Sequence, residues 1–322
     1  VFICGSCGGP MDAPWHDLVI VCSFCGCQNF PGRPDAPVPP RIPVDGRPRF
    51  SLGGRSYVIE GHLADGDSTS VYRGRWVVRL GELVVVKVQR TATDADLLRR
   101  EWNTLRALRQ SQVQGVEHFV TRLPTPIAHG LVETNRPRVT SIFGWKSGFV
   151  HTLTEAGEVH DDGIDGKVIV WILKRILELL GFVHRAGFVH GAVVPDHVLL
   201  HPRDHGANLI GWTLSTPWSS GKTRPLPGRS AAWAQLYPQT DEATPRLDLQ
   251  LACRCAQAAG GWLGKKRSLL HPGLNPLLQL LERGATGSYD DAWALRDALV
   301  EASGQSFGPP GYNPLPMPGW RP

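Results

Sequence analysis

Four cysteines near the start of the chain have the spacing of a metal site. Cys4 and Cys7 form one Cys-x-x-Cys pair, and Cys22 and Cys25 form a second pair after 14 intervening residues. Four thiolates in two such pairs satisfy the tetrahedral coordination that Zn2+ prefers, and a site with no open position is structural rather than catalytic. The spacing therefore predicts one structural Zn2+ within residues 1–30.

Hydrophobic patterning predicts the elements that follow this module. Three short strands are expected within residues 57–89, and an amphipathic helix is expected over 92–110. Two more strands are expected within 124–133 and 138–145. A helix over 167–185 is apolar around most of its circumference, which is typical of a helix buried in a core.

Composition limits the class of protein. The 322 residues leave room for a short module and one larger domain, and 42% hydrophobic with 20% charged residues is typical of globular proteins. A net charge of +5 permits acidic partners without requiring nucleic acid.

No stretch approaches the roughly 18 apolar residues of a membrane span, and no targeting segment is recognisable, so we expect a cytoplasmic location. Five of the seven cysteines lie within the first 27 residues. Because disulfides are rare in the cytoplasm, this cluster favours metal binding over disulfide bonds.

Proline-rich stretches divide the chain into parts. Residues 31–50 combine repeated prolines with arginines, which predicts a semi-rigid extended linker. The end of the chain is rich in Pro and Gly and is expected to pack along the surface or to stay loose. We therefore predict a metal-binding module (1–30), a linker (31–50), a main domain (51–303) and a tail (304–322).

The stretch 187–213 resembles the catalytic and metal loops of protein kinases. The motif His-Arg-Asp aligns with His190 to Ala192, so the base Asp is an alanine. The metal-binding Asn that follows is His197, and the metal-binding Asp of Asp-Phe-Gly is Gly211. The resemblance implies an α+β, bilobal protein-kinase-like fold without the residues for phosphoryl transfer, which is the pattern of a pseudokinase.

The small-lobe motifs of the kinase family are also incomplete. The glycine-rich motif over 64–71 keeps only Gly66 of its three glycines. The lysine of Val-Ala-Ile-Lys is Lys87, and Glu101 takes the place of its salt-bridge partner; as residue types alone they also fit a strand lysine and a solvated helix glutamate. Val85 replaces the alanine beside adenine. The resemblance therefore places a vestigial nucleotide site at Lys87 and Glu101, where we expect ATP to bind weakly or not at all.

Several structural positions of the family are retained. Asp248 matches the Asp that braces the catalytic loop from beneath, and Trp212 can fill the apolar role of the Phe in Asp-Phe-Gly. The Ser-, Pro- and Gly-rich stretch that begins at 215 is placed like the family's activation segment, which closes at Thr240. The ion pair that ends this segment in the family is lost on both sides, at Thr240 and Ser288. Losing both partners leaves no stranded charge.

The Cys pairs resemble a zinc ribbon. A zinc ribbon joined to a kinase-like domain resembles bacterial kinase-like proteins that accompany von Willebrand A-domain proteins and metal-dependent Ser/Thr phosphatases. The resemblance implies a protein partner of one of these kinds. Nucleic acid is less favoured, because Trp15 and Phe24 in the ribbon stand without adjacent Lys or Arg.

Three functions compete on the sequence. The leading hypothesis is a catalytically inactive pseudokinase that acts as a scaffold or allosteric regulator. The enzyme alternative is an atypical nucleotide-dependent transferase that uses Asp196, His197 or Asp204 as metal ligands. The third is a nucleic-acid-binding protein led by the zinc ribbon.

Overall fold

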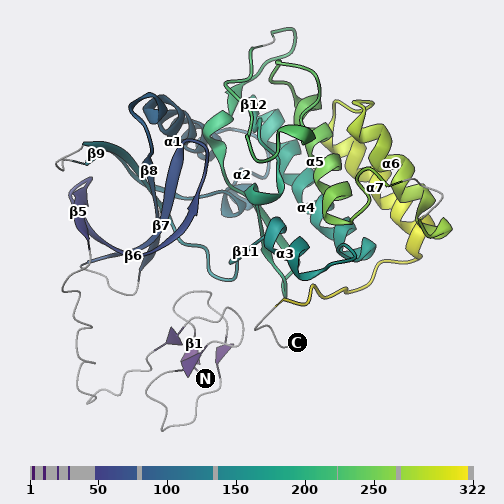
Figure 1. The fold of residues 1–322 in the computed structure, drawn as a ribbon, viewed down its shortest axis with the longest axis horizontal. Helices are drawn as coiled ribbons and strands as arrows, with labels where there is room; N and C mark the ends of the chain where they lie inside the picture. The colour runs from purple at the N-terminus through teal and green to yellow at the C-terminus, as the bar shows by residue number, and fades with distance from the viewer. Residues whose placement is uncertain are drawn as a thin grey trace.

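The computed structural model describes residues 48–77, 82–132, 137–222, 224–265 and 270–317, together with four two-residue strands nearer the N-terminus. The chain forms two lobes, the small one at the left and the large one at the right of Figure 1. The small lobe is a six-stranded sheet with one long helix, and the large lobe is mainly helical.

The small-lobe sheet has the strand order β5-β6-β7-β8-β10-β9, and all of its pairings are antiparallel. Its strands are Arg49–Leu52 (β5), Arg55–Asp65 (β6), Thr69–Trp76 (β7), Leu83–Gln89 (β8), Pro126–Val132 (β9) and Arg138–Gly144 (β10). The three strands expected within 57–89 are β6, β7 and β8, so that prediction is confirmed. Because β5 begins at Arg49, the sheet starts two residues inside the predicted linker.

The two faces of this sheet have different roles. Tyr57, Val86 and Ile142 belong to an apolar cluster on one face. Lys87 lies on the other face, because neighbours along a strand alternate between faces. The helix α1 (Ala95–Arg109) packs against β9 and β10 and follows the short 3-10 helix η1 (Ala92–Asp94), so the helix predicted over 92–110 is confirmed.

The large lobe is built around α4 (Gly166–Arg185), which contacts α5, α7 and β14. Its other helices are α2 (Val116–Phe119), α3 (Leu153–Val159), α5 (Pro245–Ala259), α6 (Asn275–Ala285) and α7 (Ala292–Phe307). Helix starts carry the expected caps, since Asp165 accepts from Lys167 N at the start of α4 and Thr244 accepts from Leu247 N at the start of α5. None of the helices in the described ranges is long and apolar enough to cross a bilayer.

The loops outside the six-stranded sheet and the long helices contain short strands and 3-10 turns. The strands are β11 (His151–Thr152), β12 (Phe188–Val189), β13 (Val198–His201), β14 (Gly206–Leu209) and β15 (Thr216–Pro217). The turns are η2 (Val120–Arg122), η3 (Pro195–His197), η4 (Trp212–Leu214), η5 (Ala234–Leu236) and η7 (Pro272–Leu274). Hairpin β13–β14 lies between the aligned catalytic and metal loops, so it brings them together.

The C-terminal tail packs on the large lobe. Helix α7 continues to Phe307, beyond the predicted boundary at 303, and Phe307 packs against the large-lobe core. After it, Leu315 and Met317 are buried, and the Tyr312 hydroxyl donates to the Arg203 carbonyl at 3.1 Å. Of the two behaviours expected for the tail, its described part, which ends at residue 317, has the packed one.

The N-terminal module is described only at its strands. β1 (Phe2–Ile3) pairs with β2 (Pro10–Met11), and β3 (Ile20–Val21) pairs with β4 (Gln28–Asn29), both antiparallel. In sequence, each hairpin encloses one Cys-x-x-Cys pair. The predicted ligands Cys4, Cys7, Cys22 and Cys25 themselves lie outside the described residues.

Candidate functional site

Lys87 and Glu101 form a buried ion pair between the sheet and α1. Lys87 Nζ lies 2.6 Å from Glu101 Oε1, and the Glu101 side chain is fully buried. Lys87 Nζ also lies 5.6 Å from the centre of the Phe143 ring. The predicted pairing of the two residues is therefore present, and the apolar surroundings make each charge dependent on the other.

The same glutamate reaches the metal loop. Its Oε1 accepts a hydrogen bond from the backbone N–H of Trp212 at 3.1 Å. The Trp212 ring is fully buried and meets His190 edge-on, with 4.3 Å between the ring centres. The tryptophan thus takes the packing position predicted for it and ties α1 to the large lobe.

Asp248 braces the catalytic loop, as predicted. Its carboxylate is fully buried and accepts from the backbone N–H of His190 and of Gly191, each at 2.8 Å. The third partner is His184 Nε2 at 2.9 Å. Three donors around one buried carboxylate hold the loop in its kinase-like path although its chemical residues are missing.

The position of the absent base is apolar and closed. Ala192, Val193 and Val194 are all fully buried. A methyl group at residue 192 can neither accept a proton nor orient an acceptor hydroxyl. The loop therefore serves as packing for the large-lobe core.

The position of the absent metal ligand is filled by a histidine. A Cβ placed on Gly211 would lie 2.4 Å from ring atoms of His197. His197 Nδ1 is 2.8 Å from the carbonyl oxygen of Ala192, which fixes the ring, and burial lowers the pKa of His197. A neutral ring in this place leaves no room for a carboxylate at residue 211, so these residues do not fit a Mg2+ site of the kinase type.

The alternative metal ligands face other groups. Asp196 accepts from Thr154 Oγ1 and from Trp233 Nε1, the latter at 2.7 Å. Asp204 is largely exposed and lies 3.4 Å from His201 Nε2. Across the residues that the structure describes, no three His, Cys, Asp or Glu side chains are placed to hold a metal ion.

The hairpin aligned with the glycine-rich loop is closed on itself. The Gly66 N–H donates to the Thr69 carbonyl at 2.8 Å within the turn, and Thr69 is buried. At the tip, Asp67 Oδ2 accepts from the Ala231 N–H at 3.1 Å. The Gly66 amide is therefore used within the turn and is not free to donate to a phosphate. Asp67, at the tip of the hairpin, is bonded to the activation segment.

Sequence reasoning missed three charged side chains on the same sheet face as Lys87. Arg73 pairs with Val85 across β7 and β8, and directly paired residues project from one face. Glu60 is buried between two arginines, 3.2 Å from Arg73 Nε and bonded to Arg75 Nε. In the sequence, the spacing of Val71, Arg73 and Arg75 at every second residue of β7 could have indicated that the two arginines share a sheet face. These charges stand beside Val85, where the resemblance implies an apolar slot for adenine.

Between the lobes, the chain passes through Gly144, the last residue of β10, and Trp145, and these two residues form the hinge. The Gly144 N–H donates to the Thr125 carbonyl at 2.8 Å, and the Trp145 N–H donates to the Leu83 carbonyl at 3.3 Å. Phe143, which precedes them, is buried and stands opposite Val85. Both hinge amides are thus bonded within the chain.

Arg254 replaces the ion pair that Thr240 and Ser288 cannot form. From α5, its guanidinium donates to the Leu236 carbonyl at 2.8 Å and to the Ala285 carbonyl at 3.0 Å. These carbonyls belong to the end of the activation segment and to the end of α6. The link between the two segments is therefore kept with backbone acceptors, which no side-chain motif could reveal.

Comparisons with known proteins bear on the fold. The chain is similar to the BubR1 kinase domain at 15% identity, with a TM-score of 0.60 over 80% of this chain and 83% of that one. It is also similar to vaccinia related kinase 3 at 13% identity, with a TM-score of 0.59 over 84% of this chain and 94% of the other. No family model and no curated protein sequence matches the chain. The predicted protein-kinase-like fold is therefore confirmed.

Proposed function

We propose that this chain is a catalytically inactive kinase-fold protein that acts as a protein-interaction scaffold or allosteric regulator. The observation that carries the proposal is the His197 ring beside Gly211, which fills the space of the metal-binding carboxylate. Buried Ala192 at the base position supports it independently. Phosphoryl transfer depends on metal-bridged phosphates and a positioned acceptor base, and the residues here supply neither.

The packing contacts of the fold support a structural role. The Lys87–Glu101 pair, the Glu101–Trp212 bond and the Asp248 brace connect the small-lobe sheet, α1 and the loops of the large lobe through side chains of this chain. A preorganised surface binds a partner with less loss of conformational entropy than a flexible one. The fold is then useful for presenting surfaces rather than for catalysis.

We further propose that the N-terminal module is a zinc ribbon. The two hairpins β1–β2 and β3–β4, each enclosing a Cys pair in sequence, support this proposal. Metal analysis should find about one Zn2+ per chain, and a Cys4→Ser/Cys22→Ser variant should lose it. Disulfides in freshly purified protein, or full zinc retention by the variant, would contradict the assignment.

The architecture favours a partner of the von Willebrand A-domain or Ser/Thr-phosphatase kind in the cytoplasm. Capture of such a protein by the intact chain, and its loss with the Cys4→Ser/Cys22→Ser variant, would assign the contact to the ribbon. Retention by that variant would assign the contact to the kinase-like domain. In either case the scaffold proposal stands, whereas failure to bind any protein would remove it.

The decisive test of inactivity combines transfer and binding. We expect no transfer of labelled phosphate to the chain or to generic acceptors with Mg2+ or Mn2+. We also expect no resolved thermal shift with ATP, although a ligand at 100 times its dissociation constant would add about 2.7 kcal/mol of stability. Transfer that Lys87→Ala abolishes would instead favour the atypical transferase.

A further inference from the structure

Arg100, where α1 meets the activation segment, has no side-chain partner among the described residues. Arg100 lies one helical turn before Thr104, whose hydroxyl is bonded to Ser215 Oγ at 2.8 Å. Arg100 Nε is buried without a hydrogen bond, and within the described part of the chain its guanidinium has no ion pair. A half-buried cation without a counter-charge is unfavourable, so an acidic group from outside would stabilise it.

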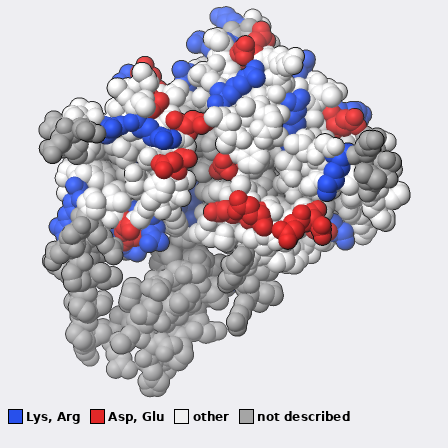
Figure 2. Space-filling view, viewed as in Figure 1, with Lys and Arg blue, Asp and Glu red and all other residues white. Residues whose placement is uncertain are grey.

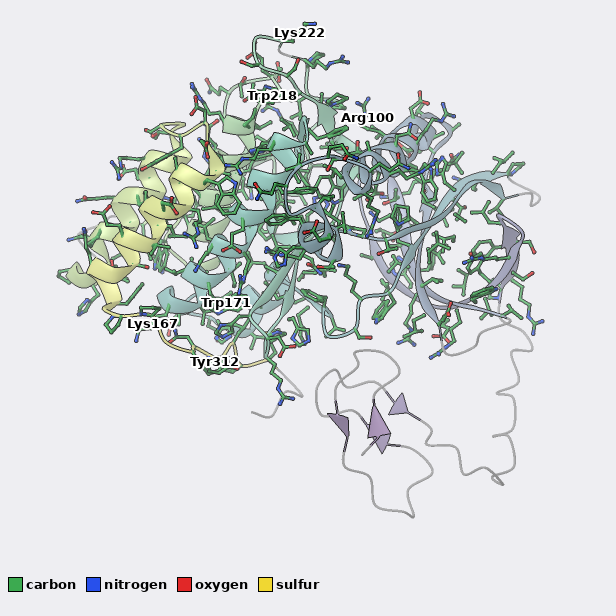
Figure 3. The ribbon with its side chains drawn as sticks, turned by 180° about the vertical axis from the view of Figure 1, so that it is seen from behind. Arg100, Lys167, Trp171, Trp218, Lys222 and Tyr312 are labelled. Carbon is green, nitrogen blue, oxygen red and sulfur yellow. The ribbon has the colours of Figure 1, made fainter. Side chains whose placement is uncertain are left out.

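The neighbouring loop is basic. No Asp or Glu occurs from 205 to 240, whereas Lys222 and Arg224 are exposed, and neither has a side-chain partner among the described residues. Trp218 is half-buried on the same loop, held by its N–H to the Gly187 carbonyl at 2.8 Å. Seen from behind in Figure 3, Arg100, Trp218 and Lys222 lie along one edge of the molecule, with Lys167 at the opposite edge.

We propose that this edge, defined by Arg100, Trp218, Lys222 and Arg224, is the surface that binds an acidic segment of a partner protein. The proposal rests on the scaffold function and names its contact surface. Trp218 offers an apolar anchor that loses little entropy on binding, and the surrounding cations supply orientation and attraction. Without a partner, Arg100 keeps an unsatisfied polar group.

Charge around the surface favours a protein over nucleic acid. Asp241 and Glu242 follow directly. The Glu242 backbone bridges to Pro225, so the exposed carboxylate of Glu242 borders the basic edge, whereas Asp241 is paired with Arg229 at 3.0 Å. A phosphate backbone running past the surface would meet this repulsion, whereas a short acidic peptide fits beside it. On the face that Figure 2 shows, acidic side chains gather over α3, away from this basic edge.

The test uses the full chain and a short labelled peptide of Glu and Asp with a central Leu. We expect saturable binding that weakens as salt rises. Because charge reversal replaces attraction by repulsion, Lys222→Glu/Arg224→Glu should weaken binding by about tenfold or more, and Trp218→Ala by a similar factor. All three residues are at least partly exposed, so these variants keep the fold, and a thermal melt checks it. Lys167→Glu is the matched control, an exposed reversal far from the surface, and should change binding less than about twofold.

Other results would overturn the assignment. Equal binding of a peptide with Gln and Asn in place of the acids would remove the electrostatic basis. Tighter binding of a single-stranded oligothymidine would assign the edge to nucleic acid instead. If Lys167→Glu weakens peptide binding as much as Lys222→Glu/Arg224→Glu does, the loss of binding reflects the net charge of the protein and not this surface. Phosphate transfer, if found, would refute the inactive-scaffold proposal without changing the peptide result, so the two proposals fail separately.

Discussion

The imidazole of His197 occupies the space that a side chain on Gly211 would need. The two residues belong to separate loops that the resemblance aligns with the two metal ligands of a kinase, and here one substitution accommodates the other. The histidine fills the position, and the glycine makes room for it. The position that the resemblance aligns with a metal ligand is therefore part of the packed interior.

Adding a methyl group at residue 211 should therefore destabilise the fold. In Gly211→Ala the Cβ costs about 1–2 kcal/mol for the left-handed backbone (φ 76°). Contact with His197 should add about 1–3 kcal/mol of overpacking. Gly221→Ala is the matched control, because Gly221 has the same φ with open space around it. Urea unfolding of the two variants should separate the backbone cost from the cost of the His197 contact. Equal losses of unfolding free energy in both variants would show that the His197 ring does not fill the space.

A companion variant tests the coupling between the two positions. In His197→Asn/Gly211→Ala the smaller side chain should relieve the contact. The stability loss of the double variant should then be smaller than the sum of the single losses, by about 0.5–3 kcal/mol. Strict additivity would mean that the two side chains do not compete for one space.

The Lys87–Glu101 pair should behave as a unit. Removing one partner leaves a buried charge without compensation, so Lys87→Met should cost about 3–5 kcal/mol of unfolding free energy. Adding Glu101→Gln should recover part of this loss, since the amide oxygen can still accept from Trp212. The exposed pair of Arg99 and Asp96 is the control, and Arg99→Gln should cost about 0–1 kcal/mol. A double variant no more stable than Lys87→Met would contradict this prediction.

Acid should destabilise the protein through His190. Burial lowers the pKa of His190 to about 3, with Asp248 opposing the shift, and Nδ1 accepts from the Ala192 N–H while Nε2 donates to the Ile210 carbonyl. An unfolded histidine protonates near pH 6.5, at about its reference pKa. Between these values the unfolded state binds more protons, so stability is complete above pH 6.5 and falls as the pH falls, by up to about 1.4 kcal/mol per pH unit.

The measurement is the unfolding free energy from pH 7.5 down to 5.5, before most carboxylates titrate. His190→Gln should flatten this dependence whatever its effect at pH 7.5, where His190 is largely neutral in both states. An unchanged slope would mean that His190 protonates as easily in the folded protein as in the unfolded chain.

The tail should contribute to the stability of the large lobe. Leu315 is fully buried, and His205 stacks between Trp171 and Tyr312 with ring centres 4.7 and 4.5 Å away. Leu315→Ala should therefore cost about 2–5 kcal/mol by thermal or urea unfolding. Leu131→Ala, at a largely exposed strand position, should stay within about 0.5 kcal/mol. Equal effects would mean that the tail is detached in solution.

The sequence by itself determined the order of most elements and the replacement of the kinase motif residues. Strands β6 to β10 and helices α1 and α4 follow from local periodicity, which is a property of neighbouring residues. The absence of the base and of the metal ligands is readable at single positions, namely Ala192, His197 and Gly211. Helix α6 was not predicted, because its apolar positions lie in a short segment between loops.

Only the tertiary structure decided what replaces the missing groups. His197 beside Gly211, Glu60 between Arg73 and Arg75, and Arg254 on two carbonyls each join residues that are distant in sequence or paired by sheet register. No local pattern encodes such contacts, because they depend on how loops and strands from different parts of the chain meet. The unpartnered state of Arg100 is likewise visible only after α1 has packed against the activation segment.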